Sequence, residues 1–146
     1  VLVLGHGELT DPILDEFIAS SIPVVVLTED GDRAAELGQR DVNVLTDDPS
    51  DEDALERAGL ADARAVVVAT EADAEDALSV LTARQLRPDV RIVAAATDRE
   101  NVDKLRRAGA DTVISPTVIG GHMLVQSALE REDMEAIANR ILGEEG

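Results

Sequence analysis

The sequence contains no cysteine, tryptophan or tyrosine, and Phe17 is its only aromatic residue. The absence of cysteine excludes disulfides, thiolate metal sites and a cysteine nucleophile. The near absence of aromatic rings removes the platforms on which nucleic-acid bases stack. No apolar run approaches the roughly 20 residues that a membrane-spanning helix needs. The core must therefore be built from Val, Leu, Ile and Ala, within a hydrophobic content of 45%.

Lysine is almost as scarce, because Lys104 is the only one and the other 12 of the 13 basic residues are arginine. With 31 acidic residues the net charge is −18, which makes nucleic acid and anionic lipid poor partners. The acid serves either a cation site or a solvated surface suited to very high salt. Because it is spread along the whole chain, we favour the second interpretation and an origin in a halophilic archaeon. We then expect the fold to be lost below molar salt.

The first residues carry the pattern of a strand, a tight glycine turn and a helix start. An apolar run over residues 1–4 leads into Gly5-His6-Gly7, and Pro12 suits a first helical turn. Backbone N–H groups and the positive end of a helix dipole meet at such a turn, where a phosphate or carboxylate fits. The third glycine of a dinucleotide fingerprint is replaced by Thr10. Both a nucleotide-binding turn and a turn that holds nothing remain open.

Short apolar runs alternate with helical patterns along the rest of the chain. Continuous apolar runs, such as residues 24–27, suit strands buried on both faces of a parallel sheet. Strands are expected at 1–5, 24–27, 42–45, 65–69, 90–96 and 111–114. Helices are expected after a cap at Thr10 or Asp11, ending at about 19, and at 33–37, 52–58, 72–86 and 100–108, with Gly38 closing the second. The pattern predicts an α/β fold with a Rossmann-like, doubly wound, six-stranded parallel sheet.

The residues that follow the strands are candidates for ligand binding, because ligands of open α/β sheets bind outside the carboxyl ends of the strands. Glu29 lies about where an acidic residue takes ribose hydroxyls, although Asp30 or Asp32 at this point could simply cap a helix. Asp48 could meet a base or ribose, or could cap the next helix. His6 could touch a phosphate when protonated, or could point into solvent. The candidate cofactor-binding residues are Gly5, His6, Gly7, Glu8, Leu9, Thr28, Glu29, Asp48 and Thr70.

The pattern changes after Pro116, where a long helix to about Leu129 and a short helix at about 134–142 are expected without a further strand. We divide the chain into a nucleotide-binding core at 1–116 and crossover and dimerisation helices at 117–146. An apolar helix added to a complete sheet is expected to cover a second copy of the chain, giving a homodimer. The alternative is that it folds back on the edge of its own sheet. Because the chain begins without Met, we expect residues before Val1.

No arrangement for catalysis is evident. His6 and His122 have no metal-ligand spacing, no Ser-His-Asp set has support, and Lys104 follows no glycine loop. Hydride transfer would need a substrate domain. We therefore expect a sensing module and no enzyme; the alternative is an NAD-dependent oxidoreductase domain, or a fragment of one, that lacks its substrate domain.

Four segments together resemble the regulator-of-K⁺-conductance family, of the RCK or TrkA-N type. They are Gly5–Gly7, Asp48-Pro49, residues 61–68 and, as the most specific block, residues 100–116. The resemblance implies a cytoplasmic gating module at the inner face of the cell membrane, acting on a potassium channel or transporter. It also implies pairing through the helix after Pro116, higher ring assembly, a membrane-embedded potassium pore as partner, and no nucleic acid.

The resemblance implies a nucleotide ligand, but several positions depart from the family pattern. Glu8 stands where an arginine is common, Thr28 where an aspartate often ends the second strand, and Asp47 where a glycine is usual. These departures add or misplace acid around an anionic ligand. An adenine nucleotide or NAD(H) is the expected cofactor, with its identity open.

Calcium-gated relatives carry carboxylates near the exits of the fourth and fifth strands. The matching positions here are Ala69, Ala95 and Thr97, so the resemblance implies that this Ca²⁺ site is missing. Glu71 and Asp98 lie close by and could still hold a cation.

Overall fold

The computed structural model describes residues 1–130, 139 and 141. It divides into two compact units, Val1–Ile114 and Ser115–Gly146. The short helix expected at about 134–142 falls outside the described residues, apart from residues 139 and 141.

The first unit contains a six-stranded parallel sheet with the order β3-β2-β1-β4-β5-β6. Val3 of the central strand pairs with Val26 on one side and Val67 on the other. The chain builds outward from β1 to β3 and then returns to the other side of β1, so the direction of winding switches between β1 and β4. The predicted doubly wound Rossmann-like sheet is confirmed. The strands are β1 (Leu2–Leu4), β2 (Val25–Thr28), β3 (Asn43–Thr46), β4 (Ala65–Val68), β5 (Arg91–Ala95) and β6 (Thr112–Ile114).

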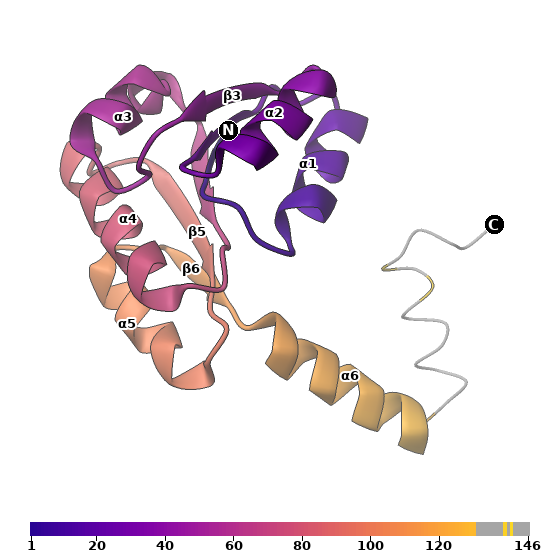
Figure 1. The fold of residues 1–146 in the computed structure, drawn as a ribbon. Helices are drawn as coiled ribbons and strands as arrows, with labels where there is room; N and C mark the ends of the chain where they lie inside the picture. Colours follow the sequence, from indigo (N-terminus) through magenta and orange to yellow (C-terminus); the bar gives the residue numbers. More distant parts are fainter. Residues whose placement is uncertain (131–138, 140, 142–146) are drawn as a thin grey trace. The chain divides into compact units, whose positions relative to one another are not determined.

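Five helices cover the two faces of this sheet (Figure 1). They are α1 (Thr10–Ala19), α2 (Gly31–Gln39), α3 (Glu52–Arg57), α4 (Asp73–Leu86) and α5 (Val102–Ala108), with 3₁₀ turns at Leu60–Asp62 and Arg99–Asn101. Helices α1 and α2 lie on one face, and α3, α4 and α5 lie on the other.

The core has two parts, one on each face of the sheet. Leu2 and Leu4 of β1 point toward the larger cluster under α3, α4 and α5, whereas Val3 points toward the smaller cluster under α1 and α2. All three side chains are almost completely buried. This double burial explains why β1 is continuously apolar in sequence. Full burial of each such side chain is worth about 1.5–3 kcal/mol.

Two predicted helix boundaries were wrong. Gly38 was expected to close the second helix, but it lies inside α2. The helix ends at Gln39, and Asp41, two residues later, adopts the left-handed φ of +59°. The N–H of Asp41 donates to Gly38 O and that of Val42 to Leu37 O. These two bonds form a Schellman motif in which an aspartate replaces the usual glycine.

The start of α1 also differs from the expectation. Thr10 or Asp11 was expected as the cap, but Leu9 occupies that position and α1 begins at Thr10. The buried Thr10 hydroxyl instead accepts a hydrogen bond from Gly7 N at 2.8 Å. Thr10 therefore stabilises the glycine turn rather than capping the helix.

The most family-specific block, residues 100–116, is anchored by an ion pair. Asp111 Oδ2 accepts from Ile92 N at 2.8 Å and from Arg84 Nη2 at 2.9 Å. Arg84 also donates to the carbonyl of Gly109 at 2.8 Å. Arg84 thus joins α4 to the turn between α5 and β6, and Asp111 holds this turn against β5.

Helix α6 (Pro116–Leu129) belongs to the second unit and matches the expected helix after Pro116. None of its 14 residues is charged. Across the described part of the chain, every helix is too short or too polar to cross a membrane.

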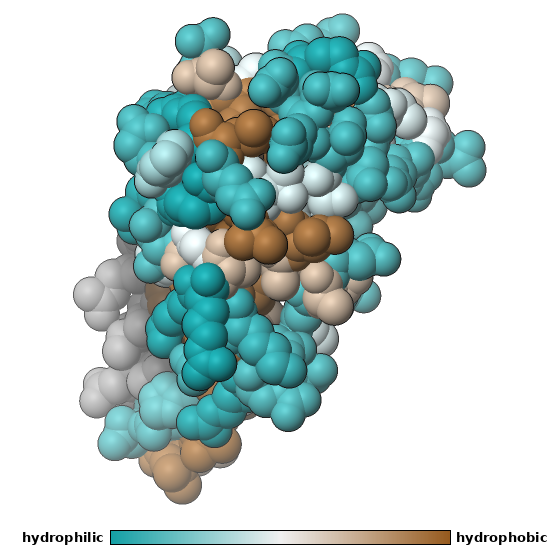
Figure 2. All heavy atoms as spheres, turned by 90° about the vertical axis from the view of Figure 1, so that its left-hand side faces the viewer, coloured by the Kyte–Doolittle hydropathy of each residue, from teal (hydrophilic) through white to brown (hydrophobic). Residues whose placement is uncertain are grey.

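Figure 2 views the side of the molecule on which α3, α4 and α5 lie in Figure 1. Hydrophilic residues cover most of this face, with smaller hydrophobic patches between them. Leu78 and Leu81 of α4 are among the exposed apolar side chains.

Candidate functional site

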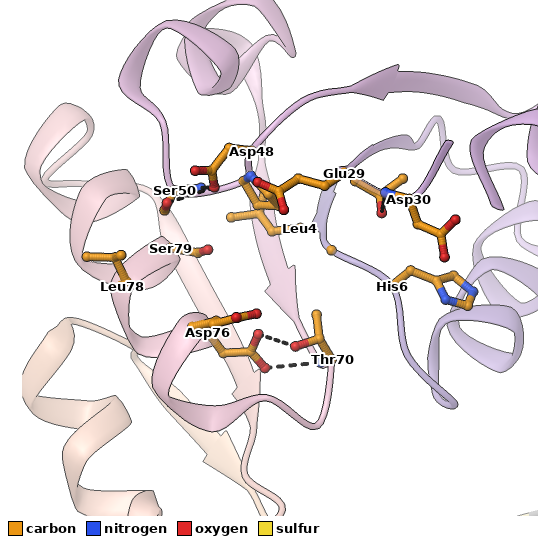
Figure 3. Close-up of a pocket in the computed structure, with 14 residues that line it drawn as sticks. Leu4, His6, Glu29, Asp30, Asp48, Ser50, Thr70, Asp76, Leu78 and Ser79 are labelled. Atoms are coloured by element: carbon orange, nitrogen blue, oxygen red, sulfur yellow. Dashed lines mark hydrogen bonds between the residues drawn. The ribbon is translucent and has the colours of Figure 1, made fainter. Parts of the chain in front are cut away.

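A pocket of about 380 Å³ opens at the carboxyl ends of the strands, beside the switch between β1 and β4 (Figure 3). The glycine turn, the exits of β2, β3 and β4, and the first turns of α4 contribute its walls. Of the nine candidate residues, those that line it are Gly5, His6, Thr28, Glu29, Asp48 and Thr70. Gly7, Glu8 and Leu9 follow in the same turn but lie outside the lining. Six of the nine candidate residues thus lie together at this pocket, and their binding of a cofactor stays a prediction.

Gly5 forms the corner between β1 and the turn. Its φ is +79°, and a Cβ at this position would collide with the methyl group of Thr70. Its N–H donates to Leu27 O at 2.7 Å, which continues the pairing of β1 with β2. Only glycine fits this corner without strain.

Gly7 lies against the exit of β4. A Cβ here would be 2.8 Å from the carbonyl oxygen of Ala69 and would overlap the carboxylate of Glu71. That carboxylate accepts from Glu8 N at 2.6 Å, while Gly7 N donates to Thr10. Two amide donors of the turn are therefore paired with side chains of the chain itself.

Of the carboxylates that follow β2 and β3, some cap the next helix and others do not. Asp30 caps α2 by accepting from Asp32 N and Arg33 N, both at 3.1 Å. Asp51, and not Asp48, caps α3. Asp48 instead accepts from the backbone and the hydroxyl of Ser50 at 2.8 and 2.7 Å. Asp48 therefore faces the pocket without serving as a helix cap.

Asp76 is a pocket residue that sequence reasoning missed. It lies in α4, is 2% exposed, and accepts from Thr70 N at 3.0 Å and from the Thr70 hydroxyl (Figure 3). Burial raises the pKa of Asp76, and the carboxylates of Asp73 and Glu71 add to this, although the bonds from Thr70 oppose it. The sequence offers one sign of this contact, which is an acidic residue in α4 six positions after Thr70.

This fold, glycine turn and strand-exit pocket can be compared with known families. The family model described as the TrkA-N domain matches residues 1–116, which is most of the chain. The chain belongs to the TrkA-N domain family. The resemblance inferred from the sequence motifs is thereby confirmed.

Relatives of this TrkA-N domain include a channel protein. The chain is 30% identical over 146 residues to "Potassium channel protein 1" of Methanocaldococcus jannaschii, with 99% of this chain and 44% of that protein covered. It thus spans less than half the length of that relative.

Solved structures of TrkA-N and RCK proteins superpose on this chain. The TrkA-N domain of the inner membrane protein ybaL from Escherichia coli superposes with a TM-score of 0.80 at 25% identity, covering 86% of this chain and 93% of that one. A structure described as the GsuK channel bound to NAD gives 0.76 at 26% identity, covering 84% and 22%. A GsuK structure described as bound to ADP gives 0.71 at 26%, covering 78% and 30%.

The exits of β4 and β5 in this TrkA-N domain are tied together by Asp73. Its carboxylate accepts from the N–H of Thr97 and of Asp98 and from Asn101 Nδ2, at 2.9–3.1 Å. Burial alone would raise the pKa of Asp73, but these hydrogen bonds lower it overall. Asp73 therefore acts here as a structural anion.

Glu71 and Asp98, the residues expected as possible cation ligands, follow β4 and β5 at these exits. Over the described residues, His, Asp and Glu side chains form no group of three or more that could hold a metal ion. Ala69, Ala95 and Thr97 stand at the positions implied for a Ca²⁺ site, whose absence from this domain stays a prediction.

His6 has a partner that the sequence did not suggest. Its Nε2 accepts from Arg33 Nε at 2.7 Å, and Arg33 Nη2 reaches both carboxylate oxygens of Asp11 at 3.0 Å. The hydrogen bond from Arg33 occupies Nε2 of His6 in this arrangement, and a contact between His6 and a phosphate stays a prediction. Arg33 links α2 to the glycine turn and to α1.

The lining of the pocket is acidic. Its carboxylates are those of Glu29, Asp30, Asp48, Glu75 and Asp76, and no Lys or Arg is found among its described lining residues. Carboxylates accept hydrogen bonds from hydroxyl and amino groups, whereas they repel phosphate. The pocket is thus chemically suited to the ribose and base of a nucleotide.

Proposed function

We propose that this TrkA-N domain is a regulatory module that controls potassium transport through a channel or transporter by sensing an adenine nucleotide or NAD(H). The observation that carries the proposal is the pocket at the β1–β4 switch, lined by Gly5 and by carboxylates that follow β2 and β3. The descriptions of GsuK bound to NAD and to ADP support the choice of ligand class. The channel protein of Methanocaldococcus jannaschii supports the choice of transport system.

In this proposal the pocket receives the nucleoside part of the ligand. Glu29 and Asp48 accept hydrogen bonds from ribose hydroxyls or from the base, and Thr70 lies on the opposite wall. The turn at Gly5, His6, Gly7, Glu8 and Leu9 faces the phosphates. A volume of about 380 Å³ lies at the small end of the range for ligand pockets, which favours a single nucleoside unit inside it.

Helix α6 is proposed to pair with a second copy of the chain. It carries no charged residue, and its Leu124 and Leu129 are about three-quarters exposed. Large apolar side chains exposed on an uncharged helix favour a covering surface. Such dimers would assemble further into a ring beneath a membrane-embedded potassium pore, on the cytoplasmic side of the membrane.

Ligand binding would regulate the pore by shifting an equilibrium between two arrangements of paired domains. A ligand shifts such an equilibrium only by its difference in affinity for the two states. The pocket joins the segments that follow four different strands with α4, so an occupant would favour whichever state holds these segments closest together.

The test is a thermal-shift panel in molar KCl with NAD, NADH, ATP, ADP, AMP, cyclic nucleotides, Ca²⁺ and Mg²⁺. A ligand that binds only the folded state adds about 2.7 kcal/mol at 100 times its dissociation constant, which gives a clear shift. We expect a shift with at least one nucleotide, and a smaller shift with Glu29→Gln. The absence of a shift with every nucleotide would contradict the sensing function.

A further inference from the structure

The glycine turn already holds an anion, and this anion belongs to the chain itself. Glu71 Oε1 accepts from Glu8 N at 2.6 Å, across 63 residues of sequence. Glu8 lies just before α1, where the N–H groups and the helix dipole favour negative charge. A phosphate bound at this turn would seek the same donor.

Gly7 makes this contact possible. A Cβ at residue 7 would overlap Glu71 Oε2 and would lie 2.8 Å from the carbonyl oxygen of Ala69. In a dinucleotide fingerprint the second glycine permits the close approach of the pyrophosphate. In this chain the same missing side chain admits the carboxylate of Glu71.

The neighbouring donor is also paired within the chain. Gly7 N donates to the Thr10 hydroxyl at 2.8 Å, and Thr10 is buried at the position of the third glycine. Thr10 and Glu71 together use the N–H groups of two consecutive residues. These two donors of the turn are therefore occupied by acceptors of the chain itself.

We propose that Glu71 competes with the phosphate of a nucleotide for the glycine turn and so sets the selectivity of the pocket between phosphorylated and unphosphorylated ligands. This inference rests on the proposed nucleotide-sensing function. A phosphate reaches Glu8 N only after the carboxylate of Glu71 has moved away, because two anions cannot share the donor.

Glu71 is able to leave. Its side chain is exposed. Its backbone has a φ of +71°, a value that residues other than Gly, Asn and Asp rarely adopt. The hydroxyl of Thr97 donates to the Glu71 carbonyl at 3.2 Å, which holds the backbone in place while the side chain can rotate. Displacement of the carboxylate thus requires no unfolding of β4 or α4.

The position of Glu71 connects the turn with the pocket. It directly follows Thr70, which donates two hydrogen bonds to Asp76 inside the pocket. A phosphate that expels Glu71 therefore acts on the same loop that contacts the nucleoside. Ligands with and without phosphate would leave this loop in different conformations.

The experiment measures the binding of ADP and of adenosine by calorimetry in molar KCl. The variants are Glu71→Gln, which keeps an acceptor without charge, and Glu71→Gly, whose backbone accepts the positive φ. Since apparent affinity scales with the fraction of binding-competent protein, we expect ADP to bind at least about tenfold more tightly to Glu71→Gly, with a smaller gain for Glu71→Gln. Adenosine affinity should stay within about twofold of the wild type because adenosine has no phosphate to compete.

Glu16→Gln is the matched control, because it removes one exposed carboxylate from α1, away from the turn. It should leave both affinities unchanged. If wild-type protein binds ADP and the Glu71 variants bind it no better, the competition is refuted while nucleotide sensing survives. If no variant binds ADP or adenosine, and no nucleotide of the thermal-shift panel binds the folded protein, the sensing function itself fails.

Discussion

Gly5 is subject to two separate constraints, its left-handed backbone and the methyl group of Thr70. We expect Gly5→Ala to lower the free energy of unfolding by about 1–3 kcal/mol, because the new Cβ costs about 1–2 kcal/mol at a positive φ and also meets Thr70. Urea unfolding in molar KCl measures this. Gly38→Ala is the control, because no atom crowds that position inside α2, and it should stabilise the protein by about 0.5–1 kcal/mol. Equal effects of the two substitutions on the free energy of unfolding would contradict the steric constraints assigned to Gly5.

Asp111 makes stability depend on acid pH. Its pKa is lowered by the N–H of Ile92 and, against some desolvation, by Arg84. A carboxyl with a lowered pKa in the folded state stabilises the fold above the unfolded pKa, near 4, and this contribution is lost as the pH falls through the folded pKa. Asp111→Asn should therefore be less stable than the wild type at pH 5–7, and the difference should shrink below about pH 4.

Urea titrations of the wild type and Asp111→Asn between pH 3 and 7, in molar KCl, give this difference. Glu56→Gln, at an exposed position of α3, serves as the control carboxylate. A gap between wild type and Asp111→Asn that stays constant down to pH 3 would show that the carboxylate charge contributes nothing.

Single side chains also mark the limit of sequence reasoning at the site. Gly5, Glu29 and Asp48 could be placed at the pocket because parallel strands bring their exits to one edge of the sheet. Glu71 at the glycine turn and Arg33 on His6 could not be predicted. Their contacts cross 63 and 27 residues, and they depend on how side chains turn within loops that carry no periodic signal.

At the scale of elements, the strands and α-helices of residues 1–130 were predictable because short apolar runs alternate along the chain with segments of helical periodicity. The ends were less predictable, since a left-handed residue terminates α2 and the sequence offered Gly38 as the obvious candidate. Asp41 takes that conformation instead, because the hydrogen bond from Val42 to Leu37 fixes where the chain must turn. The burial of Leu37 and Val42 fixes where α2 ends, rather than the preference of glycine for a left-handed backbone.

Helix α6 yields a prediction about association. If it pairs with a second copy, Leu124→Asp places a charge in an apolar interface and should shift the dimer toward monomer by at least about tenfold in dissociation constant, or about 1.4 kcal/mol. Sedimentation velocity in molar KCl measures the change. Leu81→Asp, an equally drastic substitution at an exposed position of α4, should leave association unchanged. A wild-type protein that is monomeric at all concentrations would contradict pairing through α6.

At the scale of the whole molecule, the net charge of −18 dominates. Like charges on one compact body repel, and salt weakens this repulsion because the Debye length falls from about 10 Å at 0.1 M to about 3 Å at 1 M. We expect the thermal midpoint to rise steeply with KCl and the fold to be lost well below molar salt. Circular dichroism melts across a KCl series test this, with NaCl at equal ionic strength as the control. A midpoint that does not move would contradict adaptation to high salt.

The two rims of the parallel sheet differ in what the loops there contribute. The turns that follow the strands hold the pocket, whereas α1 and α2 end at the opposite rim, where Ser21 and Asp41 adopt left-handed backbones. Glycine would be the more comfortable residue at both places. The stability of the fold can thus be changed at one rim of the sheet while the pocket at the other rim keeps its residues. Substitution of Ser21 or Asp41 by glycine would therefore change the free energy of unfolding without altering any residue that lines the pocket.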